Sequence, residues 1–76
     1  MAVDIAAQGL VALAAGLALA GTGIGTGIAE AGIGAAAVGA FAEKPELFGR
    51  LLVLVVIPES IVVFGLVIAF LLLGQL

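Results

Sequence analysis

The chain has 76 residues, of which 66% are hydrophobic and 9% are charged, and it contains no His, Trp, Tyr or Cys. Soluble globular proteins carry about a quarter charged residues, so this composition argues against an ordinary soluble domain. The absence of Cys and His removes disulfides, thiolate metal sites and the commonest general base. We find no nucleophile, base or cofactor motif, so we expect neither an enzyme nor a bound cofactor, and no nucleic-acid partner.

Two long stretches of the chain are almost free of charge. Residues 5–42 contain one charged residue, Glu30, and residues 51–76 contain one, Glu59. About 20 apolar residues cross a bilayer as an α-helix, and each stretch exceeds that length. Because hydrocarbon leaves the backbone no water to bond, each span should be a continuous α-helix. We therefore predict an all-α membrane protein in which residues 1–76 form a single antiparallel hairpin of two transmembrane helices.

The connection between the spans carries most of the charges. We place transmembrane helix 1 at about residues 4–42, the turn at about 43–47 and transmembrane helix 2 at about 48–75. Lys44 and Arg50 are the only basic residues, and both flank this turn. The positive-inside tendency therefore predicts a multi-pass protein of the cell membrane with a cytoplasmic turn and both termini on the opposite side.

The first span is built from small residues. Nine of the twelve glycines lie in it, namely Gly9, Gly16, Gly21, Gly23, Gly25, Gly27, Gly32, Gly34 and Gly39. In lipid, small residues let helix backbones approach each other closely. We predict helix-packing roles for Gly21, Gly23, Gly25, Gly27 and Gly32. Since the run at 21–27 places glycine on several sides, this helix can be approached from more than one direction.

The second span is bulky, with Leu, Val, Ile and Phe at most positions from 51 onward. A closed ring of hairpins has less room on its inner circle than on its outer one. A thin first helix suits the inner circle, and a bulky second helix suits the outer circle that faces lipid. A simple homodimer would need only one glycine stripe, so the excess of glycine favours a homo-oligomeric ring over a dimer.

Glu30 and Glu59 are the only ionisable groups deep in the spans. An ionisable residue at bilayer depth costs about 2.5 kcal/mol or more, which makes each a candidate for function; the alternative is a role in helix packing. Glu30 lies 15 residues before Pro45 and Glu59 lies 14 after it. At 1.5 Å per residue, both lie roughly 21 to 23 Å from the turn. The two carboxyl groups therefore share one depth, and they meet either within one hairpin or between neighbouring hairpins.

The two carboxyl groups predict an ion carrier. In a site of low dielectric constant they cannot both stay ionised without a cation, so the expected occupants are protons or a metal cation. A neutral site can move through lipid, whereas an emptied one must stay near water or a positive partner. Each charge that crosses 100 mV is worth about 2.3 kcal/mol, so sites moving in sequence can do work. The only Arg, Arg50, lies beside the turn and not deep in a span, so another subunit must supply the positive partner.

Further oxygen ligands are available beside the carboxyl groups. Ser60 adds a hydroxyl next to the second carboxylate, and Thr26 adds a weaker candidate four residues before the first. Pro58 cannot donate to the carbonyl of Leu54, which loosens the helix at this point. Carbonyls near Leu54 and Ile57 are therefore candidate ligands for a hard cation, which prefers oxygen.

Several segments together are typical of one family. They are the glycine run at 21–27, the turn at 43–49, the segment Ile57-Pro58-Glu59-Ser60 and the tail at 64–70. With them, nearly the whole chain resembles the c-type proteolipid of rotary ATP synthases and ATPases, most closely the archaeal A-type and vacuolar-like branch. The resemblance implies a rotor ring with helix 1 inside and helix 2 outside. It also implies that Glu59 is loaded and unloaded at a stator subunit, and that the central stalk contacts the turn at Glu43, Lys44, Pro45 and Glu46.

The resemblance leaves the transported ion open between H⁺ and Na⁺. In sodium-binding relatives, a Gln stands at the position of Glu30, a hydroxyl at that of Ser60 and a ligating carbonyl at that of Ile57. Here the Gln is replaced by Glu30, and Ile61 stands where some sodium sites have a further polar residue. We favour sodium at Glu59, Glu30 and Ser60, with protons as competitors. Some relatives carry fused double hairpins, whereas this chain has a single hairpin.

Two alternative functions remain. One is a structural proteolipid, in which the glycines serve packing and the glutamates set the register. The other is an oligomeric pore with Glu59 as a selectivity ring. A pore needs its carboxylates on the helix that faces the lumen, whereas Glu59 lies on the bulky helix.

Overall fold

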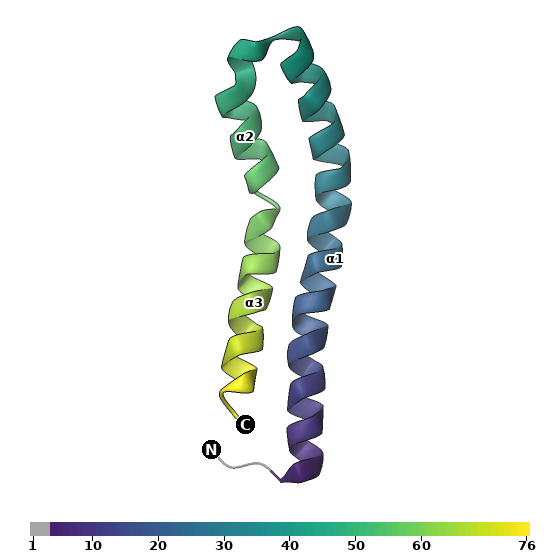
Figure 1. The fold of residues 1–76 in the computed structure, drawn as a ribbon, viewed down its shortest axis with the longest axis vertical. Coiled ribbons are helices and arrows are strands. Elements are labelled where there is room, and N and C mark those ends of the chain that lie inside the picture. The colour runs from purple at the N-terminus through teal and green to yellow at the C-terminus, as the bar shows by residue number, and fades with distance from the viewer. Residues whose placement is uncertain (1–3) are drawn as a thin grey trace.

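A computed structural model describes residues 4–76, which form an antiparallel helical hairpin 57 Å long (Figure 1). The first arm is α1 (Ile5–Glu43), and the short 3₁₀ turn η1 (Pro45–Leu47) reverses the chain. The second arm consists of α2 (Phe48–Val56) and α3 (Glu59–Leu73). The segments Ile5–Glu43 and Pro45–Leu73 have mean hydropathies of 1.7 and 2.8, and both are long and apolar enough to cross a membrane.

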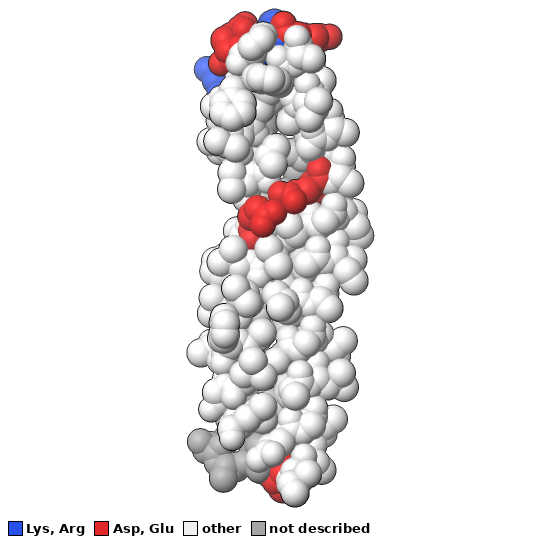
Figure 2. Space-filling view, viewed as in Figure 1, with Lys and Arg blue, Asp and Glu red and all other residues white. Residues whose placement is uncertain are grey.

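Both ends of α1 are set by local chemistry. The Asp4 side chain accepts a hydrogen bond of 2.7 Å from the Ala7 amide, which satisfies one of the free N–H groups at the helix start. At the other end, Pro45 disfavours helical backbone in the residue before it, and α1 stops at Glu43. Charged side chains gather at the turn, while Asp4 marks the opposite end of the hairpin (Figure 2).

The second arm is interrupted at Ile57 and Pro58, so the prediction of a continuous helix in this span is wrong. Pro58 has no N–H to donate to the carbonyl four residues earlier. The backbone bond before the break joins Ile57 N to Val53 O at 3.1 Å. After the break, Ser60 N and Ile61 N donate to the carbonyls three residues back, both at 3.1 Å. The proline thus removes one bond, and the chain bridges the gap with tighter turns before α3 begins.

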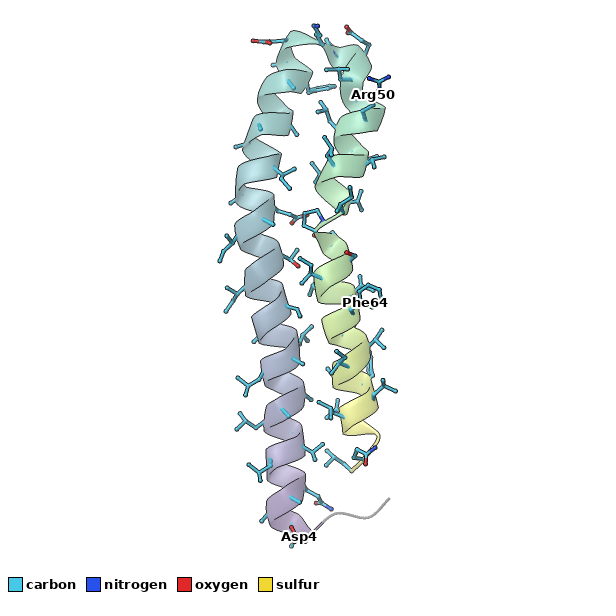
Figure 3. All side chains as sticks on the ribbon, turned by 180° about the vertical axis from the view of Figure 1, so that it is seen from behind. Asp4, Arg50 and Phe64 are labelled. Atoms are coloured by element: carbon cyan, nitrogen blue, oxygen red, sulfur yellow. The ribbon has the colours of Figure 1, made fainter. Side chains whose placement is uncertain are left out.

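One face of the second arm packs on α1 along its whole length. Between residues 51 and 72, the less exposed positions are 51, 55, 58, 62, 65, 69 and 72, whose spacing of three and four residues defines a single helical face, and Glu59 at the edge of that face. This face continues across the break, and α3 packs on α1 more extensively than α2 does. Most large apolar side chains point away from the partner arm, as Phe64 does with 67% of its surface exposed (Figure 3). Such exposure suits a chain surrounded by lipid or by further copies.

The end of the hairpin near the turn is held by two aromatic rings. Phe41 and Phe48 meet edge to face, with ring centroids 5.7 Å apart. Below them, an apolar groove of about 270 Å³ lies between α1 and α2, lined by residues that include Gly34, Ala37 and Leu51. The two arms are therefore closely packed along α3 and less so along α2.

Gly65 lies close against the opposite arm, and the sequence patterns did not single it out. A Cβ atom added at Gly65 would overlap the side chain of Thr22. By contrast, a Cβ atom would meet nothing within 4 Å at any of the α1 glycines predicted to serve packing, namely Gly21, Gly23, Gly25, Gly27 and Gly32. These glycines are thus not needed to close the hairpin, and their packing role remains a prediction about contacts with other chains.

Replacing Gly65 by Ala is expected to destabilise the hairpin relative to Gly49→Ala. Both changes bring the same gain in helix propensity, about 1 kcal/mol. Only the Cβ at position 65 overlaps a neighbour, whereas the one at position 49 meets nothing within 4 Å. We expect a difference of about 1–3 kcal/mol, the usual penalty of overpacking. Unfolding by sodium dodecyl sulfate in mixed micelles, followed by circular dichroism, measures it; equal stabilities would contradict the close contact.

Candidate ion-binding site

An acidic pair lies between the middle of the hairpin and the turn, on a face that is otherwise uncharged between the two ends (Figure 2). It is formed by Glu30 of α1 and Glu59, the first residue of α3. The two carboxyl groups lie next to each other. Both are half-buried at the edge of the contact between the arms. Of the two arrangements left open by the sequence, the structure contains the one in which the pair forms within a single hairpin.

The closeness of the two carboxyl groups limits the charge that the pair can hold. An ionised carboxylate only accepts hydrogen bonds, so a bond can form between the two groups only when one of them carries a proton. Two negative charges side by side in an apolar environment are strongly unfavourable, so the pair needs at least one proton or a cation.

The break in the second arm determines how Glu59 is presented. Pro58 is buried, and Glu59 follows it directly at the start of α3. The Pro58 carbonyl accepts two hydrogen bonds, one of 3.1 Å from Ile61 N and one of 3.1 Å from the hydroxyl of Thr26 on α1. Thr26 is itself buried, with 5% of its surface exposed. The backbone just before the carboxylate is thus tied to the opposite arm.

The other two predicted ligands are paired with each other. The Ser60 hydroxyl donates to the Ile57 carbonyl at 2.8 Å, and that carbonyl also accepts the 3.1 Å bond from Ser60 N. Within residues 4–76, no hydrogen bond joins this set to the acidic pair. The same residues contain no group of three or more His, Cys, Asp or Glu side chains that could hold a metal ion. A cation bound here would therefore need hydroxyl or carbonyl oxygens in addition to the two carboxyl groups.

The predicted stalk-contacting residues are remote from this pair. Glu43, Lys44, Pro45 and Glu46 are all exposed, at the far end of the hairpin where α1 meets η1. Acidic and basic side chains alternate there over a small area, as Figure 2 shows. The hairpin thus presents one charged tip and one acidic pair, separated by an apolar stretch.

Comparison with known proteins identifies the family. Residues 13–72 match the family model that describes the C subunit of ATP synthase. The chain belongs to this ATP synthase family. It is also 48% identical over 68 residues to the A-type ATP synthase subunit K of Methanocaldococcus jannaschii. That match covers 86% of this chain and 29% of the relative, so the chain spans less than a third of the length of that protein.

Membership of this family confirms the resemblance and its A-type branch, and with them the fold class. The family consists of ring-forming membrane proteins built from two-helix hairpins, and residues 4–76 form such a hairpin. Its members are non-catalytic subunits of the membrane sector, so this chain is not itself an enzyme. The acidic pair, Thr26, Pro58 and the turn all lie inside the matched residues.

Proposed function

We propose that this chain is the ion-translocating rotor subunit of the membrane sector of a rotary ATP synthase or ATPase. Glu59 is the carboxyl group that is loaded and unloaded, and Glu30 is its partner. The observation that carries the proposal is the pair of adjacent carboxyl groups between the arms of a hairpin whose only basic residues, Lys44 and Arg50, lie at the turn. Ionisable groups at such depth are rare and are usually functional.

The transported ion is H⁺ or Na⁺. For a proton, the two adjacent carboxyl groups suffice, because a single proton would let one group donate a hydrogen bond to the other. For sodium, the candidate ligands are Glu59, Glu30, the Ser60 hydroxyl and the Ile57 carbonyl, with Thr26 as a weaker one. Sodium binding would require the Ser60 hydroxyl and the Ile57 carbonyl to turn toward the carboxyl groups, since the hydroxyl now donates a hydrogen bond to that carbonyl. No cofactor takes part.

The partners follow from the surfaces that the hairpin leaves open. Identical subunits form a ring with α1 inside, where its glycines leave room for close approach, and with α2 and α3 outside against lipid. A stator subunit supplies a buried Arg to an emptied Glu59. Central-stalk subunits contact the exposed turn, which lies on the cytoplasmic side with both termini opposite.

The test is the reaction of the detergent-solubilised ring with a hydrophobic carbodiimide, followed as mass per subunit. Such a reagent modifies a protonated carboxyl group in an apolar site, so we expect modification at Glu59. The charged glutamates of the exposed turn, Glu43 and Glu46, serve as internal controls and should stay unmodified. If sodium slows the reaction, the site binds sodium. If pH alone controls the rate, the transported ion is a proton.

The same experiment separates the rotor from the two alternatives. In a structural proteolipid, neither Glu30 nor Glu59 would react with the carbodiimide in a manner that depends on pH or on sodium. In a pore, Glu59 would be in contact with water and would react with a water-soluble carbodiimide as readily as with the hydrophobic one. Either result would count against an ion-carrying Glu59.

A further inference from the structure

Thr26 forms the polar contact that ties the two arms together at the level of the break. Its hydroxyl donates to the Pro58 carbonyl at 3.1 Å, and both residues are buried. The Pro58 carbonyl belongs to the peptide unit that links Pro58 to Glu59. The hydrogen bond from α1 therefore restrains the piece of backbone from which the Glu59 side chain projects.

The backbone around Pro58 has need of such a restraint. The regular bond to the carbonyl four residues before Pro58 is lost, and the turns that follow use bonds over three residues. Thr26 adds a bond from outside the helix at this weak point. It lies four residues before Glu30, hence one turn away on the same helix. One segment of α1 thus contacts both the backbone before Glu59, through Thr26, and the Glu59 carboxyl group, through Glu30.

We propose that Thr26 is a positioning residue, which acts through the Pro58 carbonyl to hold Glu59 against Glu30. The proposal takes its functional meaning from the proposed role of Glu59. It differs from a ligand role for Thr26, because the hydroxyl acts on the backbone and not on the ion. A hydroxyl at this position, and not the shape of the side chain, is what the role requires.

The chain itself offers a matched control, Thr22. This residue lies one turn earlier on α1 and also faces α3, where it contacts Gly65. Its hydroxyl bonds within its own helix, to Ala18 O at 2.6 Å and Leu19 O at 3.2 Å. Thr22→Val therefore removes the same chemical group from the same seam without touching the Pro58 carbonyl.

The experiment is solid-state NMR of the full chain, assembled in lipid bilayers and labelled with [1-¹³C]proline and [5-¹³C]glutamate. In Thr26→Val, the Pro58 carbonyl resonance is expected to move upfield because it loses a hydrogen bond, while that of Pro45 in the turn stays in place. The cross-peak between the Glu30 and Glu59 carboxyl carbons should weaken, by up to about threefold, because losing one interhelical hydrogen bond lowers the equilibrium constant for the held arrangement by about that factor. Thr26→Ser should restore both signals, and Thr22→Val should leave both unchanged.

Three results would overturn the proposal. If the Pro58 resonance does not move in Thr26→Val, the hydrogen bond is absent from the assembled protein. If it moves while the cross-peak between the carboxyl carbons keeps its intensity, the bond exists but does not position Glu59. If Thr22→Val has the same effect as Thr26→Val, the signals report general loosening of the seam.

Carbodiimide labelling of the same samples separates this proposal from the proposed function. If the NMR signals respond as expected but Glu59 of the unaltered protein is never labelled, the rotor function fails and the positioning role stands. If Glu59 is labelled but the NMR signals of Thr26→Val match those of the unaltered protein, the rotor function stands and the positioning role fails. If Thr26→Val weakens only the protection by sodium, with both NMR signals unchanged, Thr26 is a ligand and the positioning role is refuted.

Discussion

Glu59→Gln is expected to abolish ATP synthesis driven by an ion gradient, with a loss on the order of 100-fold or more, while the ring still assembles. Glutamine has nearly the same shape as glutamate and can keep a hydrogen bond to Glu30, so the packing of α3 on α1 should survive. It cannot gain or lose a proton, and it cannot neutralise a bound cation. The site would then stay neutral at every position of the ring, and ion flow would no longer be coupled to rotation.

The measurement is ATP synthesis in vesicles under an imposed gradient of H⁺ or Na⁺, with ring assembly followed by native mass spectrometry. Glu46→Gln is the matched control, because it makes the same chemical change at an exposed position in η1. We expect normal assembly from both variants and normal coupling from Glu46→Gln alone. Normal coupling by Glu59→Gln would show that the ion is carried elsewhere, and loss of the ring would indicate a structural role for Glu59.

The level of the acidic pair could be predicted from the sequence because it depends on one geometric constant. A helix rises 1.5 Å per residue, so two residues at similar distances from the turn in an antiparallel hairpin lie side by side. In the structure, the carboxyl groups of Glu30 and Glu59 lie next to each other. Whether they meet within one hairpin or between two depends on how each helix is rotated about its axis. The rise per residue carries no information on that rotation.

The break at Pro58 shows where such reasoning stops. Proline predicts the loss of one hydrogen bond, but the extent of the break depends on which other donors are in reach. Here the Ser60 hydroxyl satisfies the Ile57 carbonyl, and Thr26 reaches the Pro58 carbonyl from the other arm. The sequence placed Thr26 on the face of Glu30, yet it offered no signal that a backbone carbonyl 32 positions away was its acceptor.

The glycines illustrate a second limit. The first span has small residues on several faces, so composition alone cannot say which face meets the second arm. In the structure that face is lined by residues such as Ala15, Thr22 and Thr26, and the glycines of the run at 21–27 make no close contact inside the hairpin. The glycine whose added Cβ atom would overlap the opposite arm is instead Gly65, a small residue in a bulky span. Its role depends on the tertiary contact with Thr22, which no local pattern encodes.

Replacing Glu30 by Leu is expected to weaken ion binding at Glu59 by about 10- to 100-fold, whereas Glu30→Gln should remain within about threefold of the unaltered protein. Leucine leaves the Glu59 carboxyl group without its polar neighbour, in a half-buried position, with the only basic side chains, Lys44 and Arg50, at the turn. Leaving a buried polar group unsatisfied costs about 1–3 kcal/mol, and more for a charged group. Glutamine keeps both a donor and an acceptor at this place, so it can bond to Glu59 whether that group is protonated or ionised.

The ion concentration that gives half-maximal protection of Glu59 from carbodiimide measures this effect, with sodium and pH varied separately. Coupled ATP synthesis should persist in Glu30→Gln and should require a higher ion concentration in Glu30→Leu. Equal protection in the two variants would mean that Glu59 works without a partner on α1, and the hydrogen-bonded pair would then have no role in ion binding. Loss of protection in Glu30→Gln as well would show that the Glu30 carboxylate is itself required. In that case its negative charge, and not its hydrogen bond, would hold the ion.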